Sequence, residues 1–157
     1  MAFASSALLF FRTAFASSKC RDVALIYRIL SMTLRVFLVE DNPSIRDVLL
    51  GLLEDSVDCE VVGIAPTQAE ATQWLARNAH GWDLMVTDLF LEEGSGMEVI
   101  KACADRKPHQ RVVVLTNYAE ASANRAISQG ADAVFDKATQ FDAFMAYAGA
   151  LIRVSNS

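Results

Sequence analysis

The stretch Arg35-Val36-Phe37-Leu38-Val39-Glu40-Asp41 runs from apolar, largely β-branched residues into an acidic pair. The same pattern, a short apolar run that ends in a polar residue, returns in Leu84-Met85-Val86-Thr87-Asp88, Val112-Val113-Val114-Leu115-Thr116 and Ala133-Val134-Phe135-Asp136-Lys137. Buried parallel strands have this composition. The sequence therefore predicts strands over about 34–40, 84–88, 112–116 and 133–136, with a fifth over 59–65.

Segments with an apolar period of 3.6 residues stand between and after these strands. The first begins at Asn42-Pro43, a cap residue followed by proline at the first helical position. The others cover about 67–78, 95–105, 120–129 and 140–153. Repeated strand–helix units predict an α/β fold in which five helices cover both faces of a five-stranded parallel sheet.

The polar ends of four predicted strands indicate a functional site. In an open α/β sheet, ligands bind at the carboxyl ends of the strands. Three acids, one hydroxyl and one ammonium would therefore converge on a single crevice, and they belong to Glu40, Asp41, Asp88, Thr116 and Lys137. Four such endings in order along the chain favour a shared function over chance.

Asp88 is the candidate phosphoacceptor, because a carboxylate can attack a phosphoryl group and form an acyl phosphate. Glu40 and Asp41 would complete a Mg²⁺ site, since this hard ion takes oxygen ligands and usually one or two carboxylates. Asp41 and Asp88 would bind the ion directly and Glu40 through water, with the backbone carbonyl of Phe90 as a further ligand. Taken singly, Asp88 would be an ordinary helix-capping residue, and the acidic pair would compensate a helix dipole.

Two further residues complete the predicted site. The hydroxyl of Thr116 can donate a hydrogen bond to a phosphoryl oxygen, and the ammonium of Lys137 can neutralise the transferred phosphate. A cation is also expected on electrostatic grounds, because clustered carboxylates repel one another. Outside this pattern, Thr116 would be a common strand residue and Lys137 a solvated surface lysine.

Charge and composition limit the classes of function. The 157 residues are 53% hydrophobic and carry a net charge of −5, which argues against a nucleic-acid groove. Residues 1–31 hold four basic residues and one acidic residue, a net charge of +3, which leaves −8 for the remainder. The three scattered cysteines, Cys20, Cys59 and Cys103, fit reduced thiols in a cytoplasmic protein.

Residues 1–32 do not follow the pattern of the rest of the chain. Met32 directly precedes the first predicted strand, so we expect the leader to be a mis-assigned start or, failing that, a disordered tail. A signal peptide is the least favoured alternative, and no apolar run is long enough to span a bilayer. The expected organisation is thus a leader over 1–32, one domain over 33–153 and a tail over 154–157.

The ordered motifs resemble the receiver domain of two-component response regulators, in its chemotaxis-type, single-domain form. The resemblance covers about 33–153 and rests on Val39-Glu40-Asp41-Asn42, Asp88 with Gly96 eight residues later, Thr116, Gly130-Ala131-Asp132 and Asp136-Lys137. It implies a flavodoxin-like, doubly wound sheet in the order 2-1-3-4-5.

The resemblance also implies a function. A sensor histidine kinase or a histidine phosphotransfer protein would donate a phosphoryl group from a phosphohistidine to Asp88 in a Mg²⁺-dependent reaction. The domain would catalyse its own phosphorylation and dephosphorylation without being a classical enzyme. Phosphorylation would draw Thr116 inward and alter protein contacts through the face formed by the fourth helix, the fifth strand and the fifth helix, with no nucleic acid involved.

Several positions depart from the family pattern. The aromatic residue usual three positions before the lysine is replaced by Val134, and Phe135 should point to the opposite face of the sheet. Tyr118 is a candidate substitute. Ala138 stands where a proline after a cis bond is usual, so the loop there is expected to differ.

Two other functions remain open. A receiver that is not phosphorylated could act as an interaction module, although the presence of every expected site residue argues against it. An aspartyl-phosphate phosphatase would need a second acid two residues after the nucleophile, where Phe90 stands. His80 and His109 lie in loop contexts and are expected to be surface residues rather than phosphohistidines.

Overall fold

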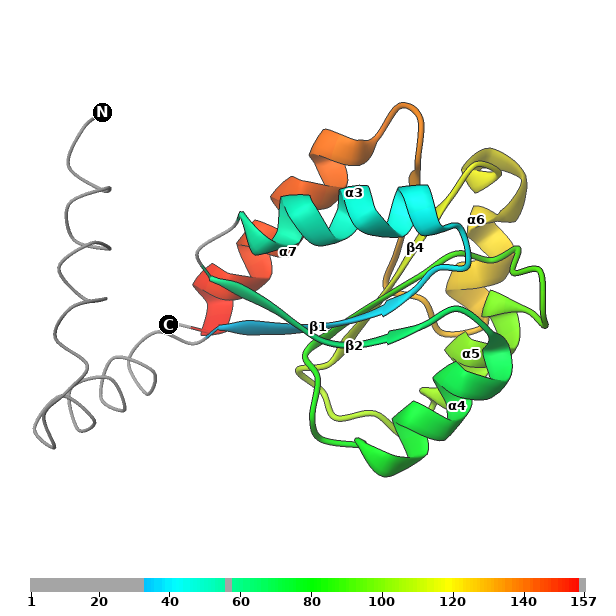
Figure 1. Cartoon of the computed structure of the whole chain (residues 1–157), viewed down its shortest axis with the longest axis horizontal. Coiled ribbons are helices and arrows are strands. Elements are labelled where there is room, and N and C mark those ends of the chain that lie inside the picture. The colour runs from blue at the N-terminus through cyan, green and yellow to red at the C-terminus, as the bar shows by residue number, and fades with distance from the viewer. Residues whose placement is uncertain (1–32, 56–57, 156–157) are drawn as a thin grey trace, which may run out of the picture. The chain divides into compact units, whose positions relative to one another are not determined.

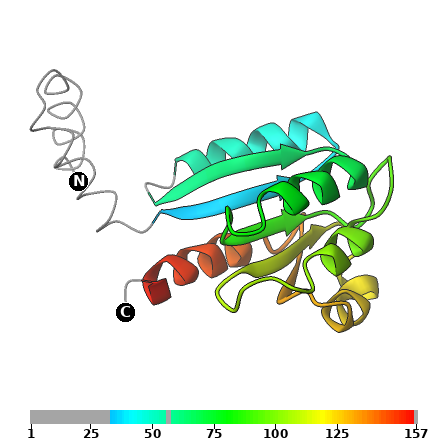
Figure 2. The ribbon, with the colours of Figure 1, turned by 90° about the horizontal axis from the view of Figure 1, so that it is seen from below.

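The computed structural model describes residues 33–55 and 58–155, and it has the predicted α/β architecture. The strands are β1 (Leu34–Val39), β2 (Cys59–Ala65), β3 (Leu84–Thr87), β4 (Arg111–Thr116) and β5 (Ala133–Asp136). All neighbouring strands are parallel, and their order is β2-β1-β3-β4-β5 (Figure 2). This confirms the predicted order and places the predicted strand bounds within one residue.

Five helices follow the strands in turn: α3 (Pro43–Glu54), α4 (Gln68–Arg77), α5 (Gly96–Ala102), α6 (Ala119–Ser128) and α7 (Phe141–Ser155). The Asn42 side chain accepts hydrogen bonds from the amides of Ser44 and Ile45, as its predicted capping role requires. Helix α5 ends at Ala102, earlier than the predicted bound of 105, and the Arg106 side chain donates to the carbonyl oxygens of Cys103 and Gln110 in the turns that follow.

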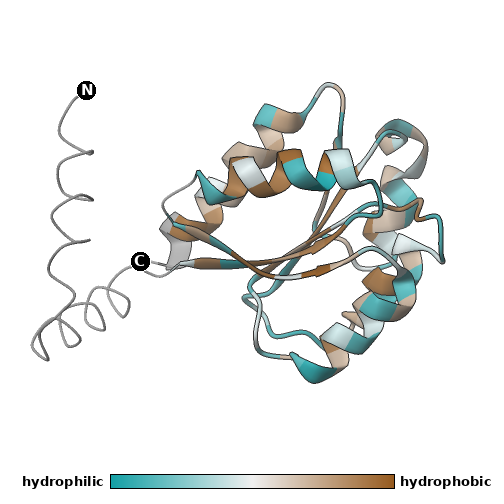
Figure 3. Ribbon diagram, viewed as in Figure 1, coloured by the Kyte–Doolittle hydropathy of each residue, from teal (hydrophilic) through white to brown (hydrophobic). Residues whose placement is uncertain are grey.

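The helices cover both faces of the sheet, as Figure 1 shows. Helices α3 and α7 pack on one face through Leu49, Leu53, Phe144 and Ala148. Helices α4, α5 and α6 pack on the other face through buried residues that include Ala71, Leu75, Val99, Ile100 and Ala126. The central strands are buried from both sides, and they appear as a hydrophobic layer between the helices in Figure 3.

One close contact packs α4 against β1 and β2. The ring of Trp74, on α4, stacks on Phe37 of β1 with centroids 4.0 Å apart. The same ring lies over Gly63, where a Cβ atom would overlap it, so a side chain on β2 is excluded at this point. Trp74 is therefore a packing residue.

The expectations for the chain ends fall outside the part of the chain that the structure describes. They concern the leader over 1–32 and the last residues of the tail, 156–157. Within the described residues, none of the helices has the length and apolar character that crossing a membrane requires.

Candidate functional site

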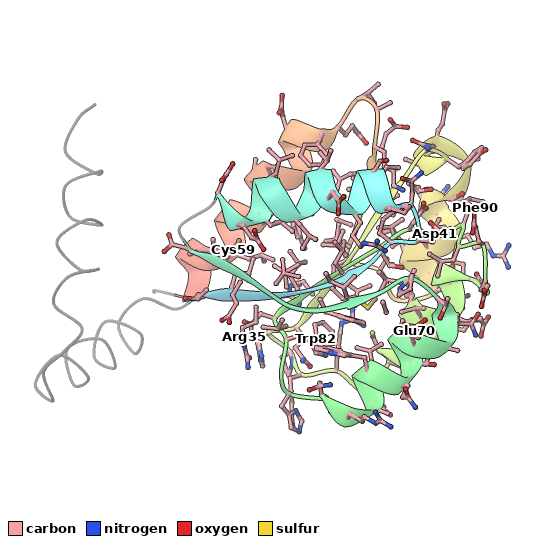
Figure 4. All side chains as sticks on the ribbon, viewed as in Figure 1. Arg35, Asp41, Cys59, Glu70, Trp82 and Phe90 are labelled. Atoms are coloured by element: carbon pink, nitrogen blue, oxygen red, sulfur yellow. The ribbon has the colours of Figure 1, made fainter. Side chains whose placement is uncertain are left out.

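The carboxyl ends of β1, β3, β4 and β5 bring the five predicted side chains to one edge of the sheet. Glu40 and Asp41 follow β1, Asp88 follows β3, Thr116 ends β4 and Lys137 follows β5. Figure 4 shows Asp41 and Phe90 at this end of the sheet, away from Arg35 near the start of β1. The convergence comes from the parallel register, in which Val39 pairs with Thr87 and Thr116 pairs with Asp136.

Three carboxylates form a compact acidic cluster. One oxygen from each of Glu40, Asp41 and Asp88 lies within 4.8 Å of the others. Glu40 is buried at 2% exposure, whereas Asp41 is half-buried and reaches solvent. An all-oxygen donor set with an accessible side matches the preference of Mg²⁺ for a few carboxylates and several water ligands. The residues present therefore fit a magnesium ion.

Lys137 supplies the positive charge of the site. Its Nζ lies 2.7 Å from Oε2 of Glu40 and 2.7 Å from Oδ2 of Asp88. Burial disfavours the charged ammonium, but the hydrogen bonds to Asp88 and Glu40 outweigh burial and raise the pKa of Lys137. Burial also raises the pKa of Glu40, and the bond from Lys137 opposes this without cancelling it. The lysine thus bridges two carboxylates that would otherwise repel each other.

Both oxygens of Asp88 accept hydrogen bonds. Oδ1 accepts from the backbone amides of Leu89 at 2.6 Å and Phe90 at 3.3 Å, while Oδ2 faces Lys137. The backbone of Asp88 is also held, because Gly96 packs directly against its carbonyl oxygen and a Cβ atom there would overlap it. Steric packing against the Asp88 carbonyl therefore explains why a glycine stands eight residues after Asp88.

Two contacts in the site had no distinct sequence signal. Asp41 Oδ2 accepts a hydrogen bond from the backbone amide of Glu92 at 2.8 Å, which ties the loop after β3 to the end of β1. The buried hydroxyl of Thr87 donates to the carbonyl oxygen of Asp88 at 2.8 Å. Both depend on loop geometry rather than on residue pattern, and they further fix the position of Asp88 and Asp41.

Thr116 is fully buried at the end of β4. Its Oγ1 accepts a hydrogen bond from the Tyr118 amide at 3.4 Å, and its carbonyl oxygen accepts one from the Lys137 amide at 3.1 Å. The residue thus lies between the loop that begins α6 and the lysine of the site. Its predicted role as a donor to a phosphoryl group stays a prediction, as does the role of the Phe90 carbonyl.

The structure bears out the predicted orientation of the residues before Lys137. Val134 packs with the core beneath α4, α5 and α6, whereas Phe135 packs on the opposite face. The Phe135 ring makes edge contacts with Phe144 and Tyr147, at centroid distances of 6.0 and 5.8 Å. An aromatic side chain of β5 therefore does not lie on the α6 side of the sheet.

The loop after β5 is closed by its own hydrogen bonds. The amides of Ala138 and Thr139 donate to Oδ1 of Asp136 at 2.8 and 3.0 Å. A proline at position 138 has no amide hydrogen to make the first bond. Among the described peptide bonds none is cis.

Both histidines are surface residues, as predicted. His80 and His109 are exposed, and Nε2 of His109 lies 3.6 Å from Oδ1 of Asp83, a residue that precedes β3. Asp83 belongs to the amino end of the strand, whereas the acidic cluster follows the carboxyl end. Neither histidine takes part in the site.

Comparison with known proteins identifies the family. The family model described as "Response regulator receiver domain" matches residues 36–148. The curated DNA-binding transcriptional activator DevR/DosR of Mycobacterium tuberculosis is 38% identical over 85 residues, covering 54% of this chain and 38% of that protein. The response regulator protein VraR of Staphylococcus aureus is 31% identical over 111 residues, covering 69% of this chain and 51% of that protein.

Solved structures share the fold. The response regulator domain of Thermotoga maritima CheB superposes with a TM-score of 0.65 at 24% identity, covering 77% of this chain and 94% of that one. A LuxR-family two-component response regulator from Aurantimonas superposes with a TM-score of 0.68 at 24% identity, covering 77% and 86%.

The comparisons leave two finer expectations unconfirmed. This chain spans about half, or less, of the length of the curated relatives named above. The chemotaxis-type, single-domain form of the resemblance is not confirmed. The exclusion of nucleic acid is not supported either, because DevR/DosR is described as DNA-binding. What the family model and the acidic cluster do show is that the chain belongs to the response regulator receiver domain family.

Proposed function

We propose that this domain accepts a phosphoryl group on Asp88 from the phosphohistidine of a sensor kinase or phosphotransfer protein, in a Mg²⁺-dependent reaction. The observation that carries the proposal is the buried Lys137 ammonium, 2.7 Å from both Glu40 and Asp88 at the edge of the acidic cluster. A structural ion pair needs one acid for one lysine. Three acids beside one cation leave an excess of negative charge, which suits a divalent ion.

The chemistry follows from the positions of the groups. An oxygen of Asp88 forms a bond to phosphorus while the bond from phosphorus to the histidine nitrogen breaks, and the electron pair of that bond stays on the imidazole. Lys137 offsets the charge on the phosphoryl oxygens, and the Thr116 hydroxyl would donate to one of them. Glu40, Asp41, Asp88 and the Phe90 carbonyl would hold Mg²⁺, which supplies further charge neutralisation when bound.

The output of the domain is a second part of the proposal. Phosphorylation would change protein contacts through the face formed by α6, β5 and α7. A receiver that acts alone and a receiver that controls an attached output domain both fit this face. Relatives such as DevR/DosR are described as DNA-binding. The proposal therefore includes control of nucleic-acid binding by another part of a longer protein.

A pseudo-receiver is the second candidate, and one observation favours it. Both oxygens of Asp88 already accept hydrogen bonds, from two backbone amides and from Lys137. Such a network satisfies the carboxylate without any metal or phosphate. It would then serve only to hold the loops in the shape that a protein partner binds.

Acyl phosphate formation distinguishes the two candidates. The full chain is incubated with acetyl phosphate or phosphoramidate, with Mg²⁺ or with a chelator, and examined by intact mass spectrometry. We expect one phosphoryl group that requires Mg²⁺, is removed by hydroxylamine and is absent in Asp88→Asn. Glu92→Gln is the matched control, because it also removes one negative charge beside the site while its amide still binds Asp41. Equal labelling of Asp88→Asn would contradict the assignment.

A further inference from the structure

Two exposed aromatic rings meet above the site. Phe90, in the loop after β3, and Tyr118, at the start of α6, lie with ring centroids 4.8 Å apart and an interplanar angle of 64°. Both residues are more than half exposed, at 58% and 59%. An edge-to-face contact is a favoured geometry for aromatic rings. It joins two loops that come from neighbouring strands of the sheet.

The backbone of each ring residue contacts a different group of the site. The Phe90 amide donates to Oδ1 of Asp88 at 3.3 Å, and the Tyr118 amide donates to Oγ1 of Thr116 at 3.4 Å. Asp88, Phe90, Tyr118 and Thr116 thus form a continuous chain of contacts.

The hydrogen bond from the Tyr118 amide to Thr116 is the longest in this series of contacts. At 3.4 Å it is longer than a typical N–H···O bond, which is about 2.9–3.0 Å. If the Thr116 hydroxyl turned to donate to a phosphoryl group on Asp88, its oxygen would move relative to the Tyr118 amide. Tyr118 precedes the first turn of α6, and its side chain makes no capping bond there. Its carbonyl oxygen accepts a hydrogen bond from the Ser122 amide at 3.1 Å, so a movement of the Tyr118 backbone would reach the first turn of α6.

The fifth strand does not offer the alternative route. Val134 is the residue on the α6 side of β5, and the Phe135 ring is held on the other face by Phe144 and Tyr147. Rotation of a β5 aromatic ring on the α6 side is thus unavailable to this chain. The exposed ring pair is the aromatic contact that lies next to both Asp88 and Thr116.

We propose that the Phe90–Tyr118 ring pair couples Asp88 to Thr116 and reports the state of the site to the start of α6. The inference rests on the proposed phosphoacceptor function. Tyr118 is then a positioning residue: its ring holds the Phe90 backbone beside Asp88, and its amide follows the Thr116 hydroxyl. Occupation of Asp88 changes the contact between the rings and with it the surface that a partner meets at α6.

Fluorine NMR of the full chain tests the coupling. The three tyrosines are labelled as 3-fluorotyrosine, and the Tyr118 and Tyr147 signals are assigned from Tyr→Phe variants. Beryllofluoride and Mg²⁺ are then added, because beryllofluoride imitates a phosphoryl group on a carboxylate. We expect bound beryllofluoride signals together with a shift of the Tyr118 signal, while the Tyr147 signal stays in place. Beryllofluoride that binds without moving the Tyr118 signal would overturn the proposal.

Variants separate coupling from mere stability. In Phe90→Leu, which keeps the backbone carbonyl at position 90, beryllofluoride should still bind while the Tyr118 response is lost. Phe135→Leu is the matched control, since its ring packs on the opposite face, and the Tyr118 response should survive. A Tyr118 response that persists in Phe90→Leu would contradict the role of the ring pair. Absence of bound beryllofluoride in the unmutated chain would instead contradict the phosphoacceptor function. The proposed coupling through the ring pair would then be contradicted as well.

The affinity for beryllofluoride gives an independent test of the ring pair. Replacing Tyr118 with leucine should weaken beryllofluoride binding by about two- to tenfold, the range expected for loss of one aromatic pair. Tyr118→Phe should restore the unmutated affinity, because it keeps the ring. Combining Tyr118→Leu with Phe90→Leu should weaken binding no further than either change alone. Additive losses would show that the two rings act separately.

Discussion

The ammonium nitrogen of Lys137 lies 2.7 Å from Oδ2 of Asp88, and the two side chains are only 8% and 11% exposed. Charges in such a position are stabilised by each other rather than by water, so the removal of one leaves the other unpaired. Because Lys137 also binds Glu40, one lysine balances a pair of acids that come from two different strands.

Substitution of Lys137 tests this balance. In Lys137→Met, Glu40 and Asp88 would face each other without a cation, and we expect the free energy of unfolding to fall by about 3 kcal/mol. Added Mg²⁺ should recover part of the loss, because it replaces the missing positive charge. Urea unfolding with and without Mg²⁺ measures both effects. The matched control is Lys101→Met, whose pair with Glu98 is half-exposed on both sides and should be worth at most about 1 kcal/mol.

The pH dependence of stability tests the burial of Glu40. Burial raises the pKa of Glu40 above its usual value of 4.5, so the folded state binds this proton more tightly than the unfolded state. The stabilisation that comes from the protonated Glu40 is then fully present below pH 4.5. It is lost as the pH rises through the higher pKa that Glu40 has in the folded state. Glu40→Gln should remove this loss. Unfolding measured from pH 4 to 7 should show the stability of the unmutated chain, relative to Glu40→Gln, falling as the pH rises; a constant difference would contradict the prediction.

Substitution of Gly96 tests the close packing behind Asp88. A Cβ atom at position 96 would overlap the carbonyl oxygen of Asp88, so Gly96→Ala must displace the Asp88 backbone. We expect a loss of about 1–3 kcal/mol in stability, the usual cost of overpacking, and weaker binding of beryllofluoride. Gly51→Ala is the control: this glycine lies in α3 with open space around it, and alanine should stabilise the helix by about 0.5–1 kcal/mol.

Removal of one carboxylate tests the proposed metal site. Asp41→Asn should weaken Mg²⁺ binding and reduce the rise in thermal midpoint that Mg²⁺ causes, because a ligand that binds only the folded state stabilises it by mass action. At tenfold excess over its dissociation constant, Mg²⁺ should add about 1.4 kcal/mol to the unmutated chain. Asp47→Asn, an exposed acid on α3, should leave the Mg²⁺ effect intact. Equal Mg²⁺ effects in both variants would argue against the site.

The fold was predictable because its central strands are buried from both sides. Such strands appear in the sequence as uninterrupted apolar runs, and the polar residue after each run marks the edge of the sheet where ligands bind. The positions of Asp88, Thr116 and Lys137 followed from this pattern alone. The steric role of Gly96 became evident only when its contact with the Asp88 carbonyl was known.

The contacts that the sequence could not predict are made by backbone groups and loop side chains. The amide of Glu92 binds Asp41, and the ring of Tyr118 meets Phe90, through loop conformations that no periodicity records. The finer family type was also beyond the sequence motifs, because the acidic pair, Asp88 and Lys137 form the proposed phosphoacceptor site. They carry no information on what is attached to a receiver domain.

The most direct test of the central claim is ¹⁹F NMR of the full chain with beryllofluoride and Mg²⁺, with Asp88→Asn and Glu92→Gln beside it. We predict bound fluorine signals that require Mg²⁺, persist in Glu92→Gln and vanish in Asp88→Asn. A folded, unmutated chain that shows no bound signal at saturating Mg²⁺ would contradict the phosphoacceptor function and favour a pseudo-receiver.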